Sequence, residues 1–186
     1  MPDTDHTHAE STLDAHRLAP AAPDEEHVYG ACCPGWHTAA DQATALDDWI
    51  DRMREAGIER VCSLVARVDS DDCDGCLDRY REAFGADSVL HAPLPDRELA
   101  DPADLRGEIL PFLDAAADED EPVVVHGLSG LGRTGQVLAA WLVHDRGDDP
   151  RTAVETVEGM GRLPGAPVDA GNATGADLYA MLDAVG

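Results

Sequence analysis

The sequence contains no lysine, and aromatic residues make up only 4% of it. All thirteen basic residues are arginine, against 38 acidic residues, so the formal net charge is −25 at pH 7. A charge of this sign and size repels the phosphate backbone of nucleic acids and the anionic surface of a membrane. We therefore expect neither nucleic acid nor a membrane as a partner.

Long apolar runs are absent as well. No run reaches the ~18 residues of a membrane-spanning helix, and the first residues lack the basic start and apolar stretch of a signal peptide. The cysteine count of five is odd, which does not suit a disulfide framework. From these absences we expect a cytoplasmic, monomeric protein whose cysteines are reduced.

Cys73 and Cys76 form a Cys-x-x-Cys pair, a spacing that occurs in zinc and redox sites. A zinc site needs four ligands, and the other candidates that lie close to one another in sequence are Cys32, Cys33 and His37. Three aspartates surround the pair, and their negative charge disfavours a reactive thiolate. We expect no metal and no cofactor.

The chain divides into a short tail and one domain. Residues 1–25 are rich in acidic residues, histidine and alanine and show no apolar periodicity, so we expect a disordered tail. Residues 26–186 are long enough for one domain, and an apolar content of 44% is enough for a packed core.

Within the domain, strand-like and helix-like patterns alternate. Helices are predicted over residues 40–56, 73–84, from Pro102 onward with a kink at Pro111, 134–144, 150–160 and 173–185. Strands are predicted over residues 60–65, 88–91 and 123–125. This alternation predicts an α/β fold with a mainly parallel central sheet flanked by helices.

The segment that follows the apolar run 123–125 carries the chemistry. Between His126 and Gly135 it contains four glycines and Arg133, and it leads into a predicted helix. Glycine lets successive backbone N–H groups converge, and a helix start adds unpaired N–H groups and a positive dipole end. The planar guanidinium of an arginine suits two phosphate oxygens. The residues expected to hold an anion are Leu128, Ser129, Gly130, Leu131, Gly132 and Arg133.

Two nucleotide-binding patterns match this segment in part. Gly130-x-Gly132-x-x-Gly135 fits a dinucleotide fingerprint, but no second strand ending in an acidic residue follows at the required distance. Gly127-x-x-x-x-Gly132-Arg133-Thr134 approaches the P-loop of nucleotide triphosphatases, but arginine stands in place of the lysine. A nucleotide-binding domain therefore remains a distant alternative.

A third pattern covers more residues. His126-x-x-x-Gly130-x-x-Arg133-Thr134-Gly135 resembles the signature His-Cys-x-x-Gly-x-x-Arg-(Ser/Thr)-Gly of cysteine-dependent protein-tyrosine and dual-specificity phosphatases. The resemblance extends over residues 28–186 and implies a small dual-specificity-phosphatase-like α/β domain. Within it, Thr134 would cap the helix or orient the loop.

Further upstream, Pro93-Leu94-Pro95-Asp96 resembles the loop that carries the general acid in this family. The resemblance implies that Asp96 protonates the leaving group in active relatives. It also implies that His126 lowers the pKa of the nucleophilic cysteine in those relatives. In this sequence we expect His126 to be a buried, hydrogen-bonded structural residue.

Gly127 occupies the position of the family's nucleophilic cysteine. These enzymes form a phosphocysteine intermediate, a step that glycine cannot perform. Loss of a nucleophile lowers rates by about 10⁴ to 10⁶. In addition, residues 172–175 lie where many relatives carry a glutamine that positions water, and this sequence has no glutamine there.

Anion binding does not need the thiol, so the leading hypothesis is a catalytically impaired domain that binds a phosphorylated protein or a small phosphoester. The first alternative is an active phosphoric monoester hydrolase. Its cysteine at position 127 would have been replaced in this chain, or water positioned by Asp96 would act slowly in its place.

The acidic, lysine-free composition also resembles that of cytoplasmic proteins of extreme halophiles. Carboxylates at this density repel one another in dilute buffer, whereas at molar salt the Debye length falls to ~3 Å and most of the repulsion is screened. We therefore expect the protein to lose its fold when KCl is removed. Thermal melting followed by circular dichroism in molar and in millimolar KCl tests this, and an unchanged melting temperature would contradict it.

Overall fold

The computed structural model describes residues 15–36, 40–66 and 75–186. The strands are β1 (Ala19–Pro20), β2 (Val28–Ala31), β3 (Arg60–Ser63), β4 (Val89–His91) and β5 (Val123–His126). The helices are α1 (Gln42–Glu55), α2 (Cys76–Phe84), α3 (Pro102–Asp104), α4 (Leu110–Asp118), α5 (Gly132–Arg146), α6 (Pro150–Gly159), α7 (Ala166–Asp169) and α8 (Gly175–Asp183), with a 3-10 turn η2 (Ala86–Ser88) and a π-helical turn η3 (Leu105–Ile109).

The strands form one sheet in the order β1-β2-β5-β3-β4. Strands β2, β5, β3 and β4 pair in parallel, and β1 pairs antiparallel with β2 at one edge. The central strand β5 is buried over all four residues, as expected for a parallel strand covered on both faces. The predicted α/β fold with a mainly parallel sheet is confirmed.

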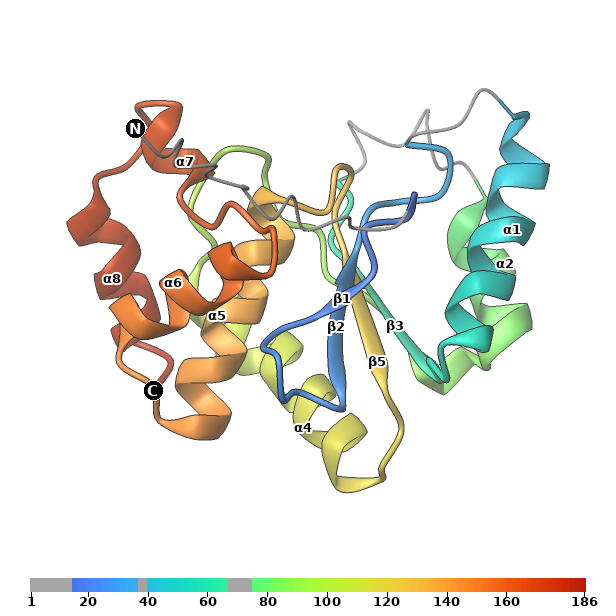
Figure 1. Ribbon diagram of the computed structural model, residues 1–186, viewed down its shortest axis with the longest axis horizontal. Coiled ribbons are helices and arrows are strands. Elements are labelled where there is room, and N and C mark those ends of the chain that lie inside the picture. The colour runs from blue at the N-terminus through green and yellow to red at the C-terminus, as the bar shows by residue number, and fades with distance from the viewer. Residues whose placement is uncertain (1–14, 37–39, 67–74) are drawn as a thin grey trace, which may run out of the picture.

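Helices cover both faces of the sheet (Figure 1). On one side α1 and α2 pack through Trp49, Met53 and Tyr80, and Val124 of β5 faces this cluster. On the other side lie α4, α5, α6 and α8, and Val123 and Val125 face them. Because successive side chains of a strand point to opposite faces, β5 contributes to both cores.

Helix α5 is buried around its circumference. Every residue from Arg133 to Val143 is buried, because the helix lies between the sheet and the helices α6 and α8. A helix enclosed in this way is a fixed element of the core. The loop that precedes it is therefore anchored at both ends, by β5 and by α5.

The expected tail extends less far than predicted. Ala19–Pro20 form β1, and Ala21 and Ala22 are buried in the core. The prediction of disorder up to residue 25 is therefore wrong for residues 15–25, and residues 1–14 lie outside the described part of the chain. Two paired residues and a few small alanines leave no periodic pattern that a sequence could reveal.

The oxidation state of the cysteines differs from the expectation at one position. Cys76 at the start of α2 is disulfide-bonded, so the prediction of reduced cysteines is wrong there, whereas Cys32, Cys33 and Cys62 are free. Cys73, the other half of the Cys-x-x-Cys pair, lies outside the described residues. Among the residues that the structure describes, no cluster of three or more potential ligands could hold a metal ion.

At the kink predicted for Pro111, the helix contains the π-helical turn η3, which lies just before the proline. Proline has no N–H to bond the preceding turn, and in η3 the N–H of Leu110 donates to the Leu105 carbonyl five residues back. Leu105 and Ile109 nevertheless face the core. None of the described helices is long and apolar enough to cross a bilayer.

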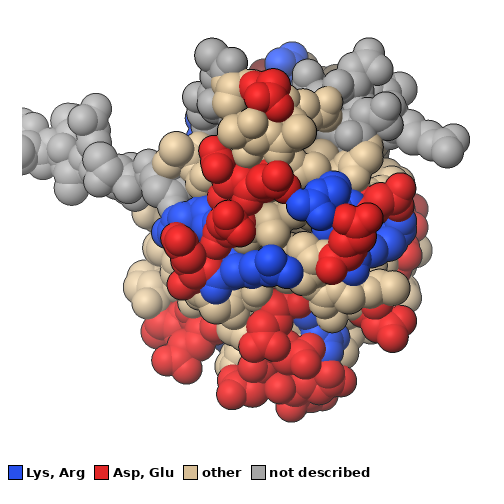
Figure 2. All heavy atoms as spheres, turned by 90° about the vertical axis from the view of Figure 1, so that its right-hand side faces the viewer, with Lys and Arg blue, Asp and Glu red and all other residues tan. Residues whose placement is uncertain are grey.

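Charged side chains of both signs alternate on the face that carries α1 and α2 (Figure 2). Arg79 lies 2.6 Å from Asp47 and 2.8 Å from Glu82, and thus joins the two helices. Exposed pairs of this kind contribute about 0.2–1 kcal/mol each. They offset part of the mutual repulsion among the carboxylates.

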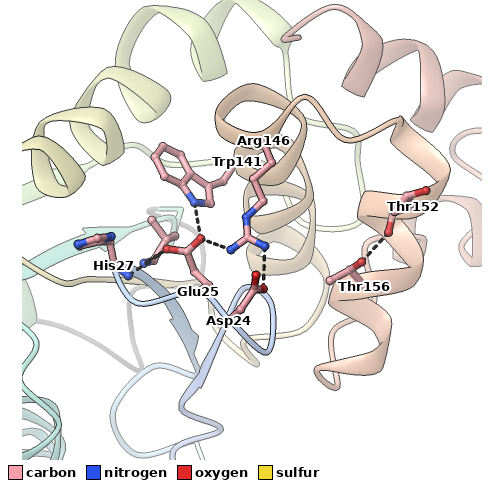
Figure 3. A network of polar contacts seen from close by, with 8 residues as sticks. Asp24, Glu25, His27, Trp141, Arg146, Thr152 and Thr156 are labelled. Atoms are coloured by element: carbon pink, nitrogen blue, oxygen red, sulfur yellow. Dashed lines mark hydrogen bonds and ion pairs between the residues drawn. The ribbon is translucent and has the colours of Figure 1, made fainter.

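A buried carboxylate fastens the N-terminal segment to α5 (Figure 3). Glu25 accepts hydrogen bonds from Trp141 Nε1 at 3.2 Å, Arg146 at 2.9 Å and the backbone N–H of His27 at 3.0 Å. Burial raises the pKa of Glu25, but these hydrogen bonds outweigh burial, and the pKa lies below its ordinary value. The Glu25 carboxylate is therefore held in its charged form.

We expect Glu25→Ala to lower the free energy of unfolding by about 3 kcal/mol at neutral pH, because it leaves Arg146 and the Trp141 N–H without their buried acceptor. A carboxyl whose pKa is lowered on folding stabilises the fold above its ordinary pKa of 4.5. That contribution is lost as the pH falls through the pKa of the folded state, so the difference between the two proteins should shrink in acid. Urea denaturation of the parent protein and Glu25→Ala, at neutral pH and at pH values below 4.5, measures the difference in unfolding free energy.

Asp24→Ala is the matched control. Asp24 binds the same Arg146 at 2.8 Å, but its side chain is 79% exposed. An exposed ion pair contributes at most about 1 kcal/mol. Equal losses in the two variants would contradict a special role for the buried carboxylate.

Candidate functional site

The candidate site lies at the carboxyl end of the sheet. β5 ends at His126, residues 127–131 form a loop, and α5 begins at Gly132. β2 and β3 end beside it, since Ala31 and Ser63 both pair with His126. In α/β folds this edge is where ligands bind.

The carbonyl groups of the loop are all held by protein donors. Cys33 N–H donates to the Leu128 carbonyl at 3.0 Å, and Leu163 N–H donates to the Leu131 carbonyl at 3.1 Å. The two carbonyls between them accept from arginines, as Ser129 O accepts from Arg17 at 2.9 Å and Gly130 O accepts from Arg162 at 2.7 Å.

The backbone N–H groups of residues 128–132 find no such partner. Within the described residues, none of them donates to a protein acceptor. The peptide units of the loop are thus turned so that carbonyls are bonded to the surrounding protein and N–H groups are left for a ligand. Together with the N-terminus of α5, this is the arrangement that binds anions elsewhere.

Two glycines of this region are required by the fold. Gly130 has a φ of +73°, and a Cβ there would lie 2.4 Å from the Ala31 carbonyl oxygen. At Gly135 a Cβ would lie 2.9 Å from the backbone nitrogen of Pro164. Any larger residue would displace backbone at either position.

Gly127 is not required in this way. Its φ lies outside the left-handed region, and a Cβ would lie 3.5 Å from both Arg133 Nε and Thr134 Oγ1, which is ordinary contact. The Gly127 N–H donates to Thr134 Oγ1 at 2.9 Å. Thr134 thus orients the loop, and it makes no capping hydrogen bond at the start of α5.

Arg133 and Asp96 meet although they are distant in sequence. The Arg133 side chain is 4% exposed; one of its nitrogens donates to the Leu94 carbonyl at 3.3 Å, and another lies 3.6 Å from the Asp96 carboxylate. The second carboxylate oxygen of Asp96 lies 3.7 Å from Arg97 Nε. Asp96 therefore sits between two guanidinium groups.

A cavity of about 250 Å³ opens at this point. Its lining residues come from the segments after β2 and after β4, from the loop, from α5, and from α7 and the segment before it. They are Trp36, Asp96, Arg97, Leu128, Ser129, Leu131, Gly132, Arg133, Gln136, Leu163, Ala166 and Pro167. Trp36 and Leu163 are the exposed large apolar side chains of the described residues. The structure thus brings Asp96, Arg133 and the predicted anion loop to one cavity.

His126 lies beneath the loop and does not reach the cavity lining. Its Nδ1 donates to the Gly127 carbonyl at 3.1 Å. The rings of Trp49 and Tyr80 pack edge-on against the imidazole, with ring centroids 5.4 and 5.6 Å away. Burial, aided by the charge of Arg133, lowers the pKa of His126 to about 4. The imidazole is therefore neutral at pH 7, and its buried Nε2 has no hydrogen-bond partner among the described residues.

Three polar residues around the site have no signal in the sequence. Gln136 on α5 accepts from Ala100 N–H at 2.9 Å and donates to the Glu98 carbonyl at 3.1 Å. Asn172 donates to the Arg97 carbonyl at 2.8 Å. These two side chains fix the segment that carries Asp96.

Arg162 is the third, and it is completely buried. Besides Gly130, its guanidinium donates to the carbonyls of Gly30 at 2.7 Å and Arg17 at 2.8 Å. A Cβ at Gly30 would lie 2.9 Å from this guanidinium, so glycine there makes room for it. A lone arginine after a helix gives no indication of this role in the sequence.

We expect Gly130→Ala to lower the free energy of unfolding by about 2–4 kcal/mol, because the added methyl meets backbone and the left-handed conformation is strained. Gly127→Ala should stay within about 1 kcal/mol of the parent protein, since its Cβ fits. Urea denaturation of both variants measures the difference. Comparable losses would show that glycine at position 127 is also demanded by the fold.

Solved structures of phosphatases share this fold. Tk-PTP in its active form aligns with a TM-score of 0.63 at 24% identity, covering 84% of this chain and 93% of that chain. PTPMT1 in complex with PI(5)P aligns with a TM-score of 0.67 at 14% identity, covering 90% and 96%. TpbA of P. aeruginosa in complex with pTyr aligns with a TM-score of 0.56 at 21% identity, covering 87% and 86%.

Curated relatives match over a shorter stretch. The dual specificity protein phosphatases OPG106 of monkeypox virus and H1 of variola virus are each 28% identical over 67 residues, which is 36% of this chain. The chain spans 39% of the length of these relatives.

A family model described as a polymorphic toxin system DSP-PTPase phosphatase matches residues 36–147. The match runs from before α1 to the end of α5 and includes Asp96 and the loop before Arg133. It covers more than half of the sequence, so the protein belongs to the DSP-PTPase phosphatase family.

Proposed function

We propose that the protein binds a phosphate monoester, on a phosphorylated protein or a small phosphoester, in the loop of residues 127–133, and that it is catalytically impaired. The observation that supports binding is the orientation of the loop. Its carbonyls at 128–131 are bonded to the protein, while the N–H groups of 128–132 have no acceptor among the described residues.

Charge supports the same ligand. Arg133 has its guanidinium at the cavity, and the N-terminus of α5 adds a partial positive charge. A phosphate dianion can accept from several backbone N–H groups and from the arginine fork at once. The Asp96 carboxylate lies 3.6 Å from Arg133, and a phosphate bound in the loop would take over that contact.

Impairment follows from position 127. Enzymes of this type attack phosphorus with a thiolate and form a covalent intermediate, and glycine has no atom that can do so. Burial raises the pKa of the free Cys62 to about 12, so this thiol stays protonated. Cys32 and Cys33 are also buried and do not line the cavity.

The protein nevertheless leaves room for a side chain at position 127. A Cβ there meets Arg133 and Thr134 at ordinary contact distance. A thiol attached to it would lie next to the guanidinium and the start of α5, and both favour the thiolate. The cysteine variant therefore has the environment that an active phosphatase needs.

We expect Gly127→Cys to raise the hydrolysis of an aryl phosphate by about 10⁴-fold or more over the chain as it stands, because it supplies the missing nucleophile. Gly127→Ala is the matched control, since it fills the same space without a nucleophile, and should stay at the basal rate. Steady-state assays in molar KCl compare the three proteins. Equal rates would show that hydrolysis does not depend on position 127 and that the chain is not impaired by its glycine.

We expect Arg133→Ala to weaken the binding of inorganic phosphate or vanadate about 100-fold, because two charge-assisted hydrogen bonds are lost. Isothermal titration calorimetry on the parent chain and on the variant measures the two dissociation constants. Arg133→Lys keeps the charge without the planar fork and should give an intermediate affinity. Unchanged affinity in Arg133→Ala would place the anion outside this loop.

A further inference from the structure

Arg97 adopts an unusual backbone conformation at the mouth of the cavity. Its φ is +56°, in the left-handed region that side-chain-bearing residues other than asparagine and aspartate seldom occupy. Such a conformation persists where the surrounding structure imposes it, and residues held in this way cluster at functional sites. The reason for this conformation is therefore to be sought in the surroundings of Arg97 and in what its side chain does.

Side-chain amides from two other elements hold Arg97 in place. Asn172, just before α8, donates to the Arg97 carbonyl at 2.8 Å. Gln136 on α5 bonds the backbone of residues 98 and 100. The left-handed turn is thus fixed from both sides, and Arg97 is one of the residues that line the cavity.

The guanidinium of Arg97 is available to a ligand. Its side chain is 73% exposed, and its contact with a carboxylate is the long one of 3.7 Å to Asp96. Two other arginines lie much closer to a carboxylate, Arg79 at 2.6 Å from Asp47 and Arg146 at 2.8 Å from Asp24. The N–H groups of the Arg97 guanidinium are therefore available at the cavity mouth, because their contact with the Asp96 carboxylate is long.

The spacing of the two arginines fits one ligand with two anionic groups. The two oxygens of the Asp96 carboxylate reach Arg133 and Arg97 at 3.6 and 3.7 Å respectively. Two guanidinium groups that share one carboxylate lie within reach of neighbouring groups of a single ligand. When phosphate occupies the loop at Arg133, Arg97 faces whatever lies beside that phosphate.

We propose that Arg97 is a specificity-determining residue that binds the carboxylate of an acidic side chain next to the phosphorylated residue of a peptide. This inference rests on the proposed binding of phosphate at Arg133. A peptide suits the cavity rim, where Trp36 is 41% and Leu163 is 48% exposed, because apolar rim residues can pack against side chains that flank the phosphorylated one. A flat anionic membrane would meet a broad face of a protein whose net charge is −25, whereas a peptide meets only the cavity, which Arg97 and Arg133 line.

The test uses two phosphotyrosine peptides that differ only in the residues flanking the phosphotyrosine, glutamate in one and glutamine in the other. Fluorescence anisotropy at one fixed KCl concentration gives the dissociation constants for the whole chain. We expect the acidic peptide to bind about fivefold tighter, in line with a partly exposed charge pair. Arg97→Gln should bring the ratio to one, and Arg97→Glu should invert it.

Arg81→Gln is the matched control, because Arg81 is an exposed arginine on α2 that does not line the cavity. It should leave the peptide ratio unchanged. Asn172→Ala removes no charge but frees the Arg97 carbonyl, and it should reduce the preference for the acidic peptide. Inorganic phosphate, which has no second anionic group, should bind the parent chain and Arg97→Gln alike.

The outcomes distinguish a failure of the Arg97 assignment from a failure of the proposed phosphate binding at Arg133. A preference for the acidic peptide that survives in Arg97→Gln would overturn the role of Arg97. If Arg133→Ala weakened phosphate binding about 100-fold in that case, the proposed function would stand. If neither peptide competed with inorganic phosphate, the role of Arg97 would be wrong, while the binding of a small phosphoester would stand. If inorganic phosphate did not bind the parent chain either, both proposals would be wrong. Anionic vesicles that bind the parent chain better than either peptide would also overturn the assignment to a peptide.

Discussion

One buried guanidinium determines how the loop before α5 is presented. Arg162 has no exposed surface, and it joins the carbonyls of Gly130, Gly30 and Arg17, which belong to the loop, to β2 and to the N-terminal segment. A buried charge must be met by polar partners, and here backbone carbonyls provide them. Because the loop carbonyls are turned toward Arg162, Arg17 and neighbouring backbone donors, its N–H groups are turned away from them. The loop geometry for which we propose anion binding is therefore a consequence of packing behind the loop.

This arrangement separates two reasons for glycine in one short segment. At Gly130 and Gly135 the neighbouring backbone leaves no room for a Cβ, so the fold explains the residue. At Gly127 there is room, and the adjacent groups Arg133 and Thr134 lie at normal contact distance. Packing thus does not demand the glycine at position 127, where we propose that the family's nucleophile is missing. A side chain introduced at position 127 can therefore change the chemistry of the site without displacing the surrounding backbone.

The sequence predicted those parts of the fold that depend on local patterns. The helix expected over 40–56 is α1 at Gln42–Glu55, and the apolar run at 123–125 is the central strand β5. Glycine spacing also identified the loop before Arg133. In contrast, β1 has two residues and α7 one turn, too short for any periodicity. The contacts of Arg162, Gln136 and Asn172 join residues far apart in sequence, and an isolated polar residue carries no sign of its partner.

The anchoring of the segment around Asp96 has a consequence for the energetics of recognition. Gln136 and Asn172 already hold this segment against α5 and the region before α8. A ligand that enters the cavity therefore orders little additional chain, and the conformational entropy lost on association is small. The recognition that we propose for this site would be that of a preorganised receptor, in which affinity comes from complementarity with a shape that exists before the ligand arrives.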